Sequence, residues 1–338
     1  MSQIISAINE FNSRFPLVKY QSISSESDSF NQLITKRQFD LRQSSEDDEK
    51  NKFSKFKLGI YNVTPFSFDE NILVTLDPLC LSTMLILAAK THHSLHHLRS
   101  SRTDASTSSG VVLVLSYSAS PDGELPILIE DEVNRTTRKV KRKTRSTSVI
   151  NNFELGNVKD PKELMYIKLV DTILFDFFIA ALAASHDQKL IMRLYSLAGI
   201  EEKERGIFDK LMYPAVMAHL VKRFQFDVRN PTIALEYNGN TLISWIRPKY
   251  YTQALAEEFE RCQNEGIETL LQFERLYAQS GNSFLSSNTK PCIFDYKLAA
   301  MVYCICDLEE VVEDFSGIKQ KCPSLFNHCE MVMRTVMK

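Results

Sequence analysis

Three side chains near the end of the first predicted strand or the start of the helix after it could act as nucleophiles or stabilise a thiolate: Tyr61, Cys80 and Ser82. Cys80 falls at the third helical position if Asp77 is the N-cap residue, and a helix N-terminus lowers the pKa of a thiol there. Its neighbours Leu79 and Leu81 favour a different interpretation, because free cysteine is commonly buried as a small apolar residue. The sequence alone leaves both interpretations open.

A second candidate cluster is the histidine-rich segment HHSLHH at 92–97. It pairs His92 with His96 and His93 with His97 at a spacing of four, which would let each pair bind zinc if the segment were helical. No carboxylate or cysteine accompanies these histidines. We therefore expect solvated loop histidines at the end of a helix, and no metal site.

The third cluster is the basic stretch RTTRKVKRKTR at 135–145, which contains no acidic residue. Nucleic acid is one possible ligand, but the stretch lacks aromatic residues that stack on bases, and the formal charge of the whole chain is −2. A surface that meets anionic lipid headgroups or an acidic partner is the second interpretation, and a solvated loop is the third.

The apolar segment KELMYIKLVDTILFDFFIAALAA at 162–184 predicts a central core helix, because apolar residues cover nearly every face of its last turns. Asp171 and Asp176 argue against a membrane span. They are five residues apart and point in different directions on a helix, so a joint carboxylate site is not expected. Each should accept hydrogen bonds from a helix terminus or a basic partner, because a buried carboxylate needs that compensation.

Composition bounds the fold and the compartment. The chain has 338 residues, 44% of them apolar, which is enough for two packed domains, and its ten glycines favour a helix-rich protein. Its seven cysteines form no CxxC pair, which indicates a reducing compartment. The segment MSQIISAINEFNSRF has no continuous apolar core of a secretory signal and is not rich in arginine, so we expect a protein kept on the cytosolic side.

The remaining elements follow from periodicity and turn residues. Strands are predicted at 56–63, 111–117 and 123–130, and a helix at 76–90 makes the first two strands parallel with a right-handed crossover. The third strand is entered through Leu125-Pro126, a candidate cis bond. STSVINNF opens a short helix, and further helices are predicted at 162–184, 187–198, 204–224, 250–278, 293–306 and 322–337. An amphipathic helix is predicted at 2–15, and a partly mobile Ser-rich extension at 21–55.

This order of elements resembles that of glutathione-transferase-like proteins. Thr147-x-Val149-Ile150 resembles the Ser-x-Ala-Ile motif that opens their third helix, with Ser146 in place of the usual acidic residue. Cys292-Ile-Phe-Asp295 resembles their capping box in the second domain. The resemblance implies α/β plus all-α architecture, with an N-terminal helix and extension at 1–56, a thioredoxin-like domain at 57–156 and an all-helical domain at 157–338. Without the acidic residue, glutathione binding should be weak, and no cofactor is expected.

A narrower resemblance is carried by five strings in order: FPLVKY, FKLGIYNV, TLDPLCL, GELPILIE and KELMYIKLVDTILFDFF. They are similar to fungal metaxin-related proteins. The resemblance implies a non-enzymatic, peripheral subunit of the mitochondrial sorting and assembly machinery on the cytosolic face of the outer membrane. It would cap the barrel subunit beside a second metaxin-like subunit and help to recognise the C-terminal β-signal of β-barrel precursors. A cytosolic glutathione-transferase-like enzyme or glutathione-binding protein is the alternative.

Recognition of an extended β-signal needs an open sheet edge or a groove. We expect such an edge beside the third strand if the basic stretch forms an incomplete fourth strand. The candidate residues for binding a partner or precursor are Ile127, Ile129, Arg135, Arg138, Lys139, Lys141, Arg142, Lys143 and Arg145.

Overall fold

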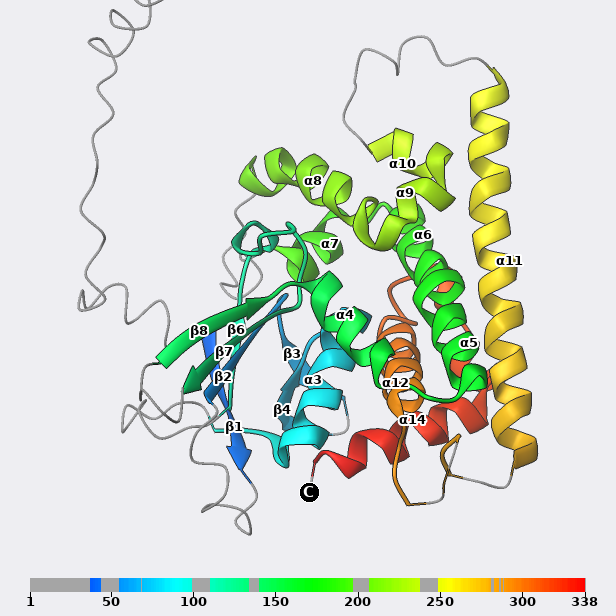
Figure 1. Ribbon diagram of the computed structural model, residues 1–338. Helices are drawn as coiled ribbons and strands as arrows, with labels where there is room; N and C mark the ends of the chain where they lie inside the picture. Colours follow the sequence, from blue (N-terminus) through cyan, green and yellow to red (C-terminus); the bar gives the residue numbers. More distant parts are fainter. Residues whose placement is uncertain are drawn as a thin grey trace, which may run out of the picture. The chain divides into compact units, whose positions relative to one another are not determined.

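The computed structural model describes residues 37–43, 55–67, 69–98, 110–133, 140–196, 207–237, 249–280, 283–285, 287 and 289–337 (Figure 1). The amphipathic helix predicted at 2–15 lies outside these residues. Residues 38–338 make up one unit of contacting elements. The architecture is mixed α/β, with a sheet formed by the first half of this unit and helices by the second.

In the described part of the chain, eight strands form the sheet in the order β3-β4-β5-β1-β6-β2-β7-β8. β2 and β6 are parallel, which confirms the predicted strand-helix-strand unit, and the other neighbouring pairs are antiparallel. The bounds are β1 Gln38–Gln43, β2 Lys55–Ile60, β3 Thr64–Phe66, β4 Asp69–Val74, β5 His93–Leu98, β6 Gly110–Val114, β7 Ile127–Val133 and β8 Val140–Arg145. The peptide bond before Pro126 is cis, as the sequence suggested.

Two strands contradict the sequence-based predictions. β1 lies inside the segment 21–55 that we predicted as a mobile extension, and it pairs with both β5 and β6. Its Phe39 and Leu41 alternate with polar residues and are buried, which is the period of a strand. β5 covers most of HHSLHH, so the predicted loop is also wrong. His93 and Leu95 are buried there, and the ring of His93 meets Phe56 edge-on.

The helices follow the predicted pattern closely, and α3 begins as expected with Asp77 as N-cap and Pro78 in the first turn. Sequence reasoning missed the short helices α9, α10 and α13. The bounds are α3 Pro78–Thr91, α4 Thr147–Gly156, α5 Pro161–Leu169, η2 Val170–Leu174, α6 Phe175–Ser185, α7 Gln188–Tyr195, α8 Ile207–Leu220, α9 Phe226–Arg229, α10 Pro231–Tyr237, α11 Lys249–Ser280, α12 Ile293–Asp307, α13 Ile318–Lys321 and α14 Pro323–Thr335.

The predicted core helix at 162–184 is continuous but changes its hydrogen bonding midway, where η2 is a π-helical turn. Asp171 and Asp176 both have basic partners, as predicted. Lys297 lies 3.0 Å from Asp171, and the guanidinium of Arg229 donates to both carboxylate oxygens of Asp176. The π-helical turn therefore carries one of these carboxylates and α6 the other, each toward a different helix.

The helix α12 connects the sheet region with the helical region, because it packs against α3, α5 and α14. Its predicted capping box is confirmed, since Asp295 accepts the backbone N–H of Cys292 at 2.7 Å. The buried apolar residues form one continuous core from β1 to α14. The domain boundary near residue 157 stays a prediction. Among the described residues, no helix is both long and apolar enough to span a membrane.

We predict that Gly266→Ala destabilises the protein by about 1–3 kcal/mol, because its new Cβ would overlap Phe177 where α11 packs on α6. The matched control is Gly156→Ala at the end of α4, where nothing lies within 4 Å of the added Cβ. Urea unfolding midpoints should fall for the first variant and hold or rise for the second. Equal midpoints would contradict close packing of α11 on α6.

Candidate functional site

The strongest polar feature near the predicted nucleophiles is a fully buried ion pair. Arg223 and Asp77 form two hydrogen bonds, at 2.5 and 3.0 Å, and the guanidinium also donates to the carbonyl of Leu125. The rings of Tyr61 and Tyr195 lie 4.9 and 5.9 Å from the guanidinium carbon. Asp77 also accepts a hydrogen bond from the backbone N–H of Cys80. The same carboxylate therefore caps α3 and binds Arg223.

An unusual local backbone places Arg223 in this position. Phe224 and Gln225, which follow it, both have positive φ, at 52° and 60°. Non-glycine residues rarely adopt this conformation, so surrounding contacts must stabilise it. Phe224 packs against Phe175 of α6, and its carbonyl accepts a hydrogen bond from Arg229. The turn after α8 thus places Arg223 beside Asp77, and the short helix α9 that follows it places Arg229 beside Asp176.

None of the three candidate nucleophiles is activated. Cys80 is fully buried, and burial, followed by the charge of Asp77, raises the pKa of its thiol well above the ordinary value. The reactive-thiol interpretation is therefore wrong, and the buried-residue interpretation holds. Burial also raises the pKa of the Tyr61 phenol, and Ser82 donates its hydroxyl to the carbonyl of Leu79. All three side chains are protonated packing residues.

Tyr61 instead belongs to a cluster with His219, which the sequence did not reveal. Its hydroxyl lies 2.7 Å from Nε2 of His219, whose ring stacks on Tyr117 at a centroid distance of 4.0 Å. Burial, followed by the charge of Arg223, lowers the pKa of His219 to about 3. His219 is therefore neutral at pH 7, and Tyr61 donates the hydrogen bond.

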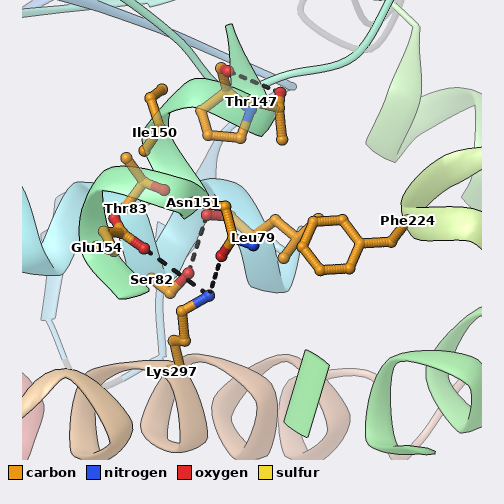
Figure 2. Close-up of a pocket in the computed structure, with 10 residues that line it drawn as sticks. Leu79, Ser82, Thr83, Thr147, Ile150, Asn151, Glu154, Phe224 and Lys297 are labelled. Carbon is orange, nitrogen blue, oxygen red and sulfur yellow. Dashed lines mark hydrogen bonds and ion pairs between the residues drawn. The ribbon is translucent and has the colours of Figure 1, made fainter. Parts of the chain in front are cut away.

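A small cavity lies where α3, α4, α12 and the segment at Pro126 meet (Figure 2). Its volume is about 10 Å³, which is room for about one water molecule. The hydroxyl of Thr147, in the transferase-like motif, donates to the carbonyl of Pro126 at 2.8 Å. Figure 2 shows Lys297 reaching from α12 toward Asn151 and Glu154, and Lys297 also pairs with Asp171. The side chains of Lys297, Asn151 and Glu154 thus bind one another. The cavity they line has no room for a ligand as large as the tripeptide glutathione.

The sheet edge that we expected beside Ile127 and Ile129 is closed. β7 pairs with β2 along one side and with β8 along the other, so the basic stretch completes its strand. Ile127 is buried, and Ile129 is partly buried. In the described part of the sheet, β8 is the terminal strand beyond β7. The expectation of an open edge at Ile127 and Ile129 is thus wrong, because it required an incomplete β8.

The structure separates the basic candidates into four groups. Arg135, Arg138 and Lys139 lie outside the described residues, and Lys141 is described by its strand pairing alone. Arg142 and Lys143 are exposed on β8. Arg145 donates to Glu130 at 2.6 Å and lies 5.3 Å from the centroid of the Phe153 ring.

The pairing of β7 with β8 brings opposite charges together, which the linear sequence does not show. In the register, Lys143 of β8 stands opposite Glu130 of β7, and the two side chains carry opposite charges. Opposite charges at such positions stabilise an antiparallel pair. Part of the basic charge therefore serves the hairpin itself. Among the described residues, no group of three or more His, Cys, Asp or Glu could hold a metal ion.

Comparison with known proteins gives two matches. The family described as SAM35, a subunit of the SAM complex, matches residues 3–130. The Sorting assembly machinery 35 kDa subunit of Saccharomyces cerevisiae is 25% identical over 291 residues, which cover 84% of this chain and 82% of that protein. The match to the yeast subunit thus extends over both the sheet and the helical region.

We predict that Arg223→Met destabilises the protein by about 3–5 kcal/mol, because it leaves the carboxylate of Asp77 buried without its cation. The matched control is Arg334→Met, which removes an exposed pair with Glu330 and should change stability by less than about 1 kcal/mol. Denaturant unfolding measures both. Similar losses for the two variants would show that Arg223 is not the central ion-pair partner of α3.

A second prediction concerns pH. Because the folded-state pKa of His219 lies below its ordinary value, the unfolded state takes up the proton first, and stability is lost as pH falls below about 6.5. His219→Gln keeps an acceptor for Tyr61 that does not titrate. Between pH 7 and 5 the unmodified protein should lose about 2 kcal/mol more than this variant. Parallel stability curves for the two proteins would contradict a neutral, partly buried His219.

Proposed function

We propose that this chain, as a relative of the 35 kDa sorting assembly machinery subunit, is a non-enzymatic subunit of the machinery that inserts β-barrel proteins into the mitochondrial outer membrane. The observation that carries this proposal is the match to that subunit over 84% of the chain. We further propose that it is a peripheral protein on the cytosolic face, where it caps the barrel subunit beside a second metaxin-like subunit and helps to recognise the β-signal of precursors.

The site geometry supports a role other than transferase chemistry. A glutathione transferase needs a group that stabilises the thiolate of glutathione, and here Tyr61, Cys80 and Ser82 are all buried. The cavity beside Thr147 and Pro126 holds about one water molecule. The alternative function therefore has little support at this position. A transferase would lack an exposed reactive group, and a glutathione-binding protein would lack space for its ligand.

We also propose that the fold is glutathione-transferase-like. The sheet segment β6-β2-β7-β8, with α3 after β2 and α4 after β8, supports a thioredoxin-like unit, to which β1, β3, β4 and β5 add a second half. The helices from α5 onward would form the all-helical domain. All seven cysteines are free, which supports a reducing environment such as the cytosolic face.

Isolation of the complex tests this function. A tagged form of the chain should co-purify with the barrel subunit from mitochondria solubilised in mild detergent, and alkaline carbonate should release it from the membranes. If it remains in the membrane pellet, depletion of the barrel subunit should make it extractable. Recovery in the cytosol, or from mitochondria without any barrel subunit, would refute the proposal.

A further inference from the structure

Two large apolar side chains lie exposed on one side of α4. Val149 and Phe153 are 47% and 54% exposed, and their spacing of four residues puts them on the same side of the helix. Single exposed apolar residues are common on protein surfaces, but two neighbours that include an aromatic ring form a patch. This patch lies next to the terminal strand of the described sheet, since α4 packs on β7 and β8.

Cations from two other elements surround the aromatic ring. Lys90, at the end of α3, and Arg145 of β8 lie 5.5 and 5.3 Å from the centroid of the Phe153 ring. Lys143 is exposed two residues before Arg145, and the alternation of a strand puts the two on the same face of β8. Glu130 pairs with Arg145 and stands opposite Lys143 in the register. The face thus holds three cations against this carboxylate, together with an exposed aromatic and an exposed aliphatic side chain.

This combination fits the surface of an anionic membrane better than it fits the alternatives. Headgroup phosphates attract lysine and arginine, while an aromatic side chain inserts at the interface between headgroups and acyl chains. An acidic strand that added to β8 would bind its backbone and would leave the patch on α4 unused. The formal charge of the whole chain is −2, so attraction to such a surface would be local and would orient the protein.

We propose that Lys90, Lys143, Arg145, Val149 and Phe153, here named the α4–β8 face, bind the headgroup region of an anionic lipid bilayer. The proposal rests on the proposed function, because it supplies the membrane contact of a peripheral outer-membrane subunit. It adds a direct lipid contact to attachment through the barrel subunit.

Flotation of the purified full chain with phosphatidylcholine vesicles, with and without phosphatidylserine, tests the face. The chain should float with the anionic vesicles and stay behind with the neutral ones, and salt should weaken binding. Lys143→Glu should weaken binding about fivefold or more, and Phe153→Ser about tenfold.

Two matched controls keep the test specific. Arg142→Glu reverses a charge on the opposite face of the same strand, and Leu211→Ser removes an apolar side chain that is 71% exposed on α8. Both should bind vesicles more tightly than the corresponding face variants. The comparison is made at a temperature at which unfolding curves show all four variants to be folded, because Lys143→Glu places a second carboxylate opposite Glu130.

Three results would overturn the proposal: equal flotation with neutral vesicles, equal losses in the face and control variants, or binding of an acidic extended peptide without binding of vesicles. Because the purified chain is used without the barrel subunit, such a failure would leave the proposed function intact. Conversely, loss of co-purification with the barrel subunit would refute the proposed function even if the vesicles bind.

Discussion

The need to neutralise a guanidinium that is fully removed from water constrains much of this structure. Arg223 can be buried because Asp77 meets it with both carboxylate oxygens. Asp77 is also the N-cap of α3, and the guanidinium reaches the carbonyl before the cis-proline bond at Pro126. One ion pair therefore fixes the start of α3, the entry to β7 and the turn after α8. The same ion pair occupies the region in which a transferase would present its reactive group.

Elements set by local chemistry were predictable from the sequence, whereas partners from distant segments were not. The cap at Asp77 and the capping box of Cys292 and Asp295 follow from short spacings, and both are present. That Asp171 needs a basic partner follows from its burial, but Lys297 is 126 residues away and no pattern identifies it. Arg223 was missed for the same reason. Nothing in its neighbourhood indicates that the backbone turns left-handed after it.

Strand pairing explains the remaining errors. Phe39 and Leu41 alternate with polar residues over too few positions to stand out among serines and charges, so β1 becomes recognisable only when β5 and β6 pair with it. At the candidate site, the stretch 135–145 contains cations without acids, yet the hairpin brings Glu130 opposite Lys143 and into contact with Arg145. A basic run was therefore predictable, but its partial neutralisation depends on a register that the linear sequence does not show.

Two features of the structure point to surfaces rather than to an interior site. The cavity beside Thr147 is nearly filled, because Thr147 bonds to Pro126 and Lys297 satisfies its neighbours from α12. A polar group bound in this way would have to lose its present partners before it could hold a ligand, and that loss is costly in a buried position. The ring of Phe153 is itself exposed, as are Lys90 and the neighbouring Val149, and Arg145 is partly exposed while paired with Glu130. Binding on α4 and β8 therefore leaves the buried network intact, whereas binding inside the cavity would require the network to open.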